Sequence, residues 1–486
     1  MSDEPPLSGV VVTGGVASVE VRVDDLVRTA RVLAEVGGEL GAVAASAGTV
    51  LADRVPGPCA LLDPAGAARA TAAVLAAVAG PSGVAAAALA VEVRAGQLLV
   101  TAARYEAADR LDGELRDLRH WLQGSAAVLA LPALPALAVV GGGWAAVTLA
   151  TGGHPLAEAE DWLADHPGVV DEISGSAPAL VSGLMTTLLG PLAVPADAAL
   201  RATTGRTLLP RTLAESAALL ALVYPPATAD VRLVGHTTQD AAPTGIGSLV
   251  AGLAATDAAA RGPAQGTLVV RRLETRGPDG TPTVSFVVDV PGTKDWQPDP
   301  RTRENVNDLA SNLELVSGEP TVRVEAVREA LRQAGAGPDD PVLLVGHSQG
   351  GLVAVRAAAD LQGDHRVTHV VTVGSPTARL DVPPTVQVLS LENRQDVVPR
   401  LDAAPNPDRA SHVTVVFDAP AATLADEHAM RVYAPAAAAL DGSGHPALRT
   451  WVRSADAFVL DGSERAWGER VTVTRSTYLV RNGDAP

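Results

Sequence analysis

Residues 341–352 read PVLLVGHSQGGL, and this stretch decides the fold. The apolar run Val342 to Val345 predicts a buried strand, and the apolar pattern after Gly351 predicts a helix. Glycines on both sides of Ser348 allow a turn sharp enough to lift the serine hydroxyl above the edge of a sheet. The pattern G-x-S-x-G is common, and its ordinary interpretation is a glycine-rich loop. With a strand before it and a helix after it, it indicates a nucleophile elbow.

Length and composition limit the classes of protein that need to be considered. A chain of 486 residues with 47% hydrophobic residues predicts two or three domains, and 3% aromatic residues predict cores of small side chains. A formal net charge of −18 argues against a nucleic-acid partner and against a basic patch that holds an anionic membrane. The single cysteine, Cys59, excludes an internal disulfide. Since the chain shows no zinc-type Cys/His spacing and no P-loop, we expect neither a metal nor another cofactor.

The first 122 residues predict an all-helical, hairpin-like domain preceded by two short β-prone runs between Gly9 and Val23. Asp24-Asp25 offers an N-cap for a long helix, and Asp63-Pro64 combines a cap with proline at the first helical position. A third helix is expected to start at Ser82 and to run towards Leu122.

A short motif in this third helix bears on export. Tyr105 to Asp109, YEAAD, follows the pattern Y-x-x-x-D/E, and after a helical hairpin it loosely resembles substrates of type VII (WXG100-type) secretion. The hairpin departs from those proteins because it lacks Trp-x-Gly at its turn; the alternative is an exposed helical Tyr/Asp pair. The N-terminus, MSDEPPLSG, is no Sec-type signal peptide. We therefore expect either a cytoplasmic protein or one exported by a non-Sec, type VII-like route with a secretion-system partner.

Residues 123–226 form an apolar, Ala/Leu-rich helical region. Residues 125–154 carry no formal charge, and a second charge-poor segment covers residues 174–196. The first is long enough to span a bilayer, but Pro132, Pro135 and three consecutive glycines interrupt it. The alternatives are membrane association, a buried helical hairpin, and an apolar cap over the Ser348 site.

Residues 227–442 alternate between strand-like and helical patterns, which predicts a mainly parallel sheet covered by helices on both faces. The fold class expected is therefore an α/β domain preceded by an all-α N-terminal region. Residues 443–486 read as a C-terminal extension, in which VRSADAFVLD and RVTVTRSTYLV suggest one or two extra strands.

A serine hydroxyl needs a base within hydrogen-bond reach, and the base needs an acceptor that holds its tautomer. In an elbow fold these partners follow in the order acid, then histidine, each after a later strand. Asp396 lies in the loop after the strand VQVLSL and is the preferred acid, ahead of Glu392 and Asp402. His428 follows the strand HVTVVF by a loop and is the preferred base. The alternatives are worse placed: His412 opens that strand at its opposite end, His445 comes after the next helix, and His347, beside the nucleophile, points elsewhere.

The oxyanion of an acyl-transfer intermediate needs preformed donors. One is the backbone N–H of Gln349, directly after Ser348. The strand VSFVVDV runs into Pro291-Gly292-Thr293, so the second is expected from the N–H of Gly292 or Thr293, with the Thr293 hydroxyl as a further donor.

The segments VVDVPGT, GHSQGG, VVTVGSP, ENRQDVVP and DEHAMRVY together resemble α/β-hydrolases of the lipase/esterase type, in particular class 3 lipase-like serine hydrolases, over about residues 231–440. Carried over, the resemblance implicates Thr293, Ser348, Gln349, Asp396 and His428. Pro291 departs from the family pattern, because those lipases usually have arginine there.

These observations predict a serine hydrolase that cleaves carboxylic esters, with an acyl ester, a lipid ester among them, as substrate. One alternative is a thioesterase or peptidase on the same fold. The other is a type VII secretion-linked or surface interaction protein with a degenerate hydrolase domain.

Overall fold

The computed structural model describes residues 8–15, 23–52, 63–80, 82–100, 192–239, 242–276, 282–294, 306–419, 421, 423–460 and 470–483, with scattered helical residues between 174 and 189. The chain divides into two compact units, one of Val19–Arg116 and the other of Met1–Ser18 with Asp117–Pro486.

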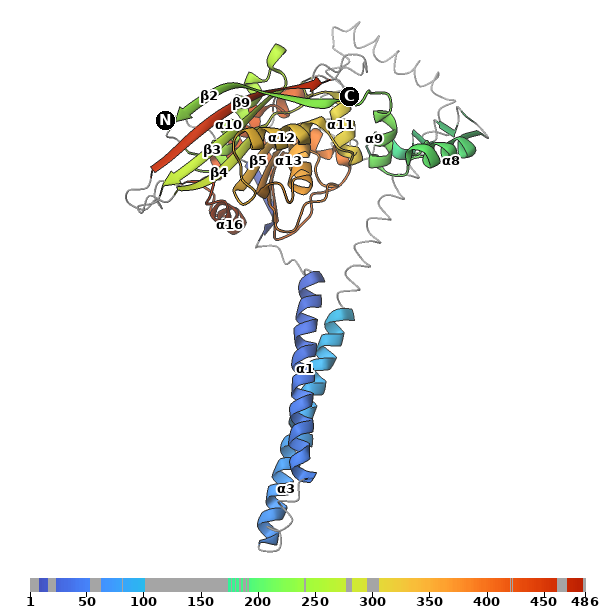
Figure 1. The fold of residues 1–486 in the computed structure, drawn as a ribbon, viewed down its shortest axis with the longest axis vertical. Coiled ribbons are helices and arrows are strands. Elements are labelled where there is room, and N and C mark those ends of the chain that lie inside the picture. Colours follow the sequence, from blue (N-terminus) through green and yellow to red (C-terminus); the bar gives the residue numbers. More distant parts are fainter. Residues whose placement is uncertain are drawn as a thin grey trace. The chain divides into compact units, whose positions relative to one another are not determined.

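The described part of the larger unit is built on a nine-stranded sheet (Figure 1). In chain order the strands are β1 (Ser8–Gly14), β2 (Thr228–Gln239), β3 (Thr267–Arg276), β4 (Pro282–Val290), β5 (Pro341–His347), β6 (Arg366–Val373), β7 (Gln387–Asn393), β8 (His412–Asp418) and β9 (Arg470–Gly483). Across the sheet their order is β1-β8-β7-β6-β5-β4-β3-β9-β2. Neighbours from β4 to β8 pair in parallel, whereas β1 on one side and β3, β9 and β2 on the other join in antiparallel pairs.

The described helices of this unit lie between and after the strands. They are α8 (Ala193–Thr204), α9 (Leu213–Ala221), α10 (Ile246–Ala259), α11 (Leu309–Ser317), α12 (Val322–Gln333), α13 (Gln349–Asp360), α14 (Leu424–Glu427), α15 (Met430–Leu440) and α16 (Pro446–Ser454), with short 3-10 turns at Gly262–Ala264 and Val398–Asp402. Their starts follow ordinary capping chemistry. Thr212, Asp308 and Thr321 each accept a hydrogen bond from a backbone N–H in the first turn of α9, α11 and α12.

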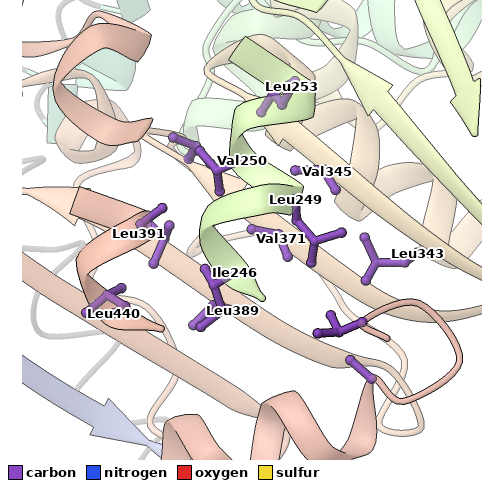
Figure 2. Close-up of a cluster of buried hydrophobic side chains, with 14 of the residues drawn as sticks. Ile246, Leu249, Val250, Leu253, Leu343, Val345, Val371, Leu389, Leu391 and Leu440 are labelled. Carbon is purple, nitrogen blue, oxygen red and sulfur yellow. The ribbon is translucent and has the colours of Figure 1, made fainter. Parts of the chain in front are cut away.

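Alternate residues of the central strands supply two separate cores, one on each face of the sheet. Along β5, Leu343 and Val345 pack against one face, and Val342 and Leu344 against the other. Figure 2 shows the first face, where Ile246, Leu249, Val250 and Leu253 of α10 meet strand residues and Leu440 of α15. The second face is covered by α12 and α13. A sheet buried on both faces explains the continuous apolar runs of these strands.

Two pairing partners come from segments that the sequence analysis assigned to other domains. β1, expected within an all-helical domain of residues 1–122, pairs with β8. β9, expected within an extension of residues 443–486, lies between β2 and β3. A strand was expected in the stretch VRSADAFVLD, but the described residues of this stretch form none. Its first three residues end α16, and Phe458 is buried against the sheet. Trp451 of α16 and Phe458 after it are both buried in the core on the first face of the sheet.

The smaller unit contains α1 (Val23–Ala52) and α3 (Pro64–Ala79), with helical residues 84–100 after them. Asp63 caps α3 as expected, since its Oδ1 accepts the N–H of Gly66 at 2.9 Å and Pro64 occupies the first turn. Close to Gly37 of α1 lie Ala88 and Glu92 of the third helical segment. Among the described residues, the helical stretch Pro64–Val100, taken as a whole, is long and apolar enough to cross a membrane by length and composition alone, a test that core helices of soluble proteins also pass.

Several expectations fall on residues outside the described ranges. These are the Tyr105–Asp109 motif, the third helix between 101 and Leu122, and the uncharged stretch of residues 125–154. Only scattered residues of the second charge-poor segment, 174–196, are described before 192. Membrane association and a type VII-like export route stay predictions.

Candidate active site

Ser348 sits at a sharp turn between β5 and α13. Its backbone adopts φ 54° and ψ −121°, a conformation that residues with a side chain rarely take. The surrounding chain leaves no room for side chains at the flanking glycines: a Cβ on Gly346 would lie 2.1 Å from the Gly350 carbonyl oxygen, and a Cβ on Gly350 would lie 2.0 Å from the Val290 oxygen. The elbow expected from residues 346–350 is therefore present in the backbone, and its strain is held by close packing on both sides.

The expected acid and base are hydrogen-bonded to each other. His428, between α14 and α15, places its Nδ1 2.7 Å from Oδ2 of Asp396, in the loop after β7. The Asp396 side chain is fully buried, whereas the His428 side chain remains 18% exposed. Because a carboxylate oxygen accepts, Nδ1 carries the hydrogen and the lone pair of Nε2 is left available to receive a proton.

Two further donors hold the Asp396 carboxylate. The buried Tyr433 hydroxyl of α15 donates to Oδ2 at 2.6 Å, and the N–H of Val398 donates to Oδ1 at 2.9 Å. The Tyr433 oxygen accepts in turn from the N–H of Asn393 at 3.1 Å. Burial and the negative charge of Asp396 raise the pKa of Tyr433 well above its ordinary value. The phenol is thus a permanent donor that orients the carboxylate.

Asn393 also ties the acid loop to the segment that carries His428. Its Nδ2 donates to the carbonyls of Ala419 and Glu427, and its Oδ1 accepts from the N–H of Ala419. Ala419 follows β8 and Glu427 directly precedes His428. One buried side chain therefore braces both ends of the histidine loop.

His347 lies against the other side of His428. The two rings stack with centroids 4.7 Å apart, and His347 Nε2 is 2.9 Å from the His428 carbonyl oxygen. Since a carbonyl only accepts, Nε2 of His347 is the donor. Burial lowers the pKa of His347, although Asp257 opposes this effect. Through the stacked ring and this hydrogen bond, the His347 side chain supports His428.

Two of the expected oxyanion donors, Gln349 and Gly292, lie next to Ser348. Gln349 is the first residue of α13, where backbone N–H groups have no partner within the helix. A Cβ on Gly292 would lie 3.0 Å from the Ser348 Cβ, so the loop after β4 passes directly beside the serine. The Gly292 N–H itself donates to Asp257 Oδ1 at 3.2 Å. The Thr293 hydroxyl accepts from Asn312 Nδ2 at 3.0 Å, and as a donor it makes only a long contact of 3.5 Å to Asn312 Oδ1.

A cavity of about 450 Å³ opens at Ser348 and Gln349, and we call it the Ser348 cavity. Its other lining residues are Thr212, Leu213, Ala214, Leu309, Asn312, Val316, Leu352, Pro376, Arg379, Leu380, Val398, Leu401 and Asp402. Most of these side chains are apolar, and the size falls within the roughly 300–1,000 Å³ of small-molecule sites.

The alternative acids and bases have other contacts. His412 begins β8, at the opposite end of the parallel strands from the elbow, and its Nε2 bonds with Ser390 Oγ at 2.9 Å. His445 caps α16. Glu392 accepts from Asn406, and Asp402 accepts from the N–H of Ala378. Within the described residues, no His428–Ser348 hydrogen bond is formed; such contacts are often long before substrate binds.

Tyr433, Asp257 and the Leu213 wall of the cavity were not predicted as parts of the site, because each reaches it only through tertiary packing. Among the residues that the structure describes, no group of three or more His, Cys, Asp or Glu side chains could hold a metal ion.

Comparison with known proteins supports the same class of fold. Residues 317–395, which include β5, the elbow, β6 and β7, match the family model described as alpha/beta hydrolase. No curated protein and no solved structure matches the chain. The matched segment, the parallel pairing from β4 to β8 and the helices that cover the sheet support a hydrolase with an α/β-hydrolase fold.

Proposed function

We propose that this protein is a serine hydrolase that cleaves carboxylic esters with an apolar acyl group through an acyl-enzyme. The observation that carries the proposal is the hydrogen bond between His428 and the buried Asp396, formed beside an elbow that presents Ser348. Serine, acid and histidine follow separate strands in that order along the chain, and this order supports the proposal because an activated nucleophile needs such partners.

In this mechanism, His428 Nε2 takes the proton of the Ser348 hydroxyl as its oxygen attacks the ester carbonyl. Asp396 keeps Nδ1 protonated and stabilises the imidazolium that forms. The oxyanion is stabilised by the Gln349 N–H and by Thr293. His428 then gives its proton to the leaving alcohol, and a water molecule activated by the same base releases the acid.

The Ser348 cavity supports an apolar acyl group. Leu213, Leu309, Leu352 and Leu380 line it, and a flexible alkyl chain buried there gains about 0.8 kcal/mol for each methylene removed from water. The limited volume favours chains of medium length over a long fatty acyl chain. The substrate proposed is therefore an ester of a medium-chain carboxylic acid.

Hydrolysis of p-nitrophenyl acetate, butyrate, octanoate and palmitate tests this substrate class. We expect kcat/KM to be highest for the butyrate or octanoate ester. Leu213→Trp should fill the cavity and shift the preference towards acetate, whereas Leu220→Trp, at a 48% exposed position of the same helix, should leave it unchanged. A preference that Leu213→Trp does not alter would contradict the cavity as the acyl site. The corresponding thioester and peptide substrates, assayed in parallel, separate an esterase from a thioesterase or a peptidase.

A further inference from the structure

The loop after β4, Pro291 to Lys294, is anchored at every residue. Arg323 donates to the Pro291 carbonyl at 3.1 Å, and Asn312 donates to the Thr293 hydroxyl. The N–H of Lys294 donates to the Asn307 carbonyl at 2.9 Å. These three partners lie on α12, on α11 and just before α11, so they reach the loop from one side of the sheet.

Asp257 anchors the same loop from the opposite side, where α10 lies. Its Oδ1 accepts the Gly292 N–H at 3.2 Å and pairs with the Lys294 ammonium at 2.8 Å. The same oxygen is 3.5 Å from Nδ1 of His347, the residue that stacks on His428. This one carboxylate oxygen therefore holds two residues of the loop and lies beside the elbow.

This carboxylate is charged and only partly exposed. The Asp257 side chain is 17% exposed and the Lys294 side chain 18%. Burial alone would raise the pKa of Asp257, but contact with His347 and the Lys294 charge outweigh it and hold that pKa below its ordinary value. An ionised carboxylate makes stronger hydrogen bonds to backbone N–H groups than a neutral acceptor does.

The geometry has a consequence for the oxyanion donors. An N–H that points at Asp257 cannot at the same time point at an oxyanion above Ser348. Of Gly292 and Thr293, the two alternatives for the second oxyanion donor, Gly292 is therefore excluded. Thr293, the next residue, is the remaining alternative, with its N–H and its hydroxyl as the candidate donors.

We propose that Asp257 is a positioning residue: it holds Gly292 and Lys294 so that Thr293 lies beside Ser348 as the second oxyanion donor. The inference rests on the proposed function, since an oxyanion forms only if Ser348 attacks an acyl group. Asp257 touches neither substrate nor reacting atoms and acts through the loop. Because the oxyanion exists only in the transition state and the intermediate, loss of Asp257 should lower kcat and leave KM nearly unchanged.

The test compares Asp257→Asn and Asp257→Ala with wild type in ester hydrolysis and in labelling by a fluorophosphonate probe. Asp441→Asn is the matched control, because Asp441 accepts the N–H of Gly247 at the other end of α10, away from Ser348. Loss of one oxyanion donor costs about 10²–10³ in kcat, so misplacing the loop should cost Asp257→Ala about 10- to 100-fold. Asp257→Asn should keep more activity, since its amide oxygen can still accept from Gly292. Asp441→Asn should keep the wild-type kcat even where its melting temperature falls.

The outcomes separate the two claims. If the wild type is active and Asp257→Ala has the same kcat, the positioning role of Asp257 is overturned and the proposed function is not. The same holds if the fall in kcat of Asp257→Ala is no larger than its unfolded fraction explains. A wild type that neither hydrolyses esters nor reacts with the probe would overturn the proposed function and this inference with it. If Asp257→Ala fails to fold, Asp257→Asn and Lys294→Met test the positioning role instead. In both variants we expect a lower kcat with a nearly unchanged KM.

Discussion

Replacing Tyr433 by phenylalanine removes one hydroxyl from the most buried part of the site. The ring can stay in place, edge-on to Phe417 with centroids 5.5 Å apart, so the change creates almost no cavity. It removes the 2.6 Å hydrogen bond to the Asp396 carboxylate and leaves the Asn393 N–H without its acceptor. A hydrogen bond to a charged group contributes about 1.5–3 kcal/mol, and an orphaned buried N–H costs about 1–3 kcal/mol. Because both contacts share one hydroxyl, we expect Tyr433→Phe to lower the free energy of unfolding by about 2–4 kcal/mol.

Urea unfolding followed by circular dichroism measures this loss. The pKa of Tyr433 is raised, so the hydroxyl keeps its proton and the loss should be the same at about pH 6 and about pH 9. Tyr478→Phe is the matched control, because Tyr478 is equally buried but packs in the core on the other face of the sheet. Its loss should stay near the roughly 1 kcal/mol of an ordinary hydrogen bond. A Tyr433→Phe loss no larger than that of the control would refute the view that this phenol braces the acid.

Three further predictions concern stability. Burial, with the negative charge of Asp402, raises the pKa of Glu392 from 4.5 to about 7, so the folded state binds this proton more tightly than the unfolded state does. Stability should therefore fall by up to about 3 kcal/mol as pH rises through this range, and Glu392→Gln should abolish the fall in urea titrations. Burial lowers the pKa of His369 and of His412 from 6.5 to about 4, so stability should be lost as pH falls from about 6.5 to about 4, most clearly in melting curves at low pH. Finally, the positive φ of Ser348 predicts that Ser348→Gly is more stable than Ser348→Ala by about 1 kcal/mol, and equal melting temperatures would show that the elbow stores no strain.

The elbow and its neighbouring strands could be predicted because their signals are local. The apolar run before Gly346 and the glycines around Ser348 specify strand, turn and helix without information from elsewhere in the chain. The order of the later strands then selected Asp396 and His428, because the carboxyl ends of parallel strands meet at one edge of the sheet. These two residues are hydrogen-bonded to each other.

What could not be predicted depends on contacts between distant segments. β1 and β9 pair with strands far away in the sequence, and their short alternating patterns say nothing about the partner. α10 was not anticipated, because its mostly apolar and small residues show no clear polar face. Asp257 lies on that helix, 35 residues before Gly292, and only the packing of α10 on the sheet brings its carboxylate to the loop.

The central claim is that Ser348 is the nucleophile of an acyl-transfer enzyme. Incubating wild type and Ser348→Ala with a fluorophosphonate probe, followed by peptide mass spectrometry, tests it most directly. The account predicts one adduct on Ser348 of the wild type, no adduct on Ser348→Ala, and ester hydrolysis only by the wild type. Equal labelling of both proteins, or equal hydrolysis by both, would contradict it.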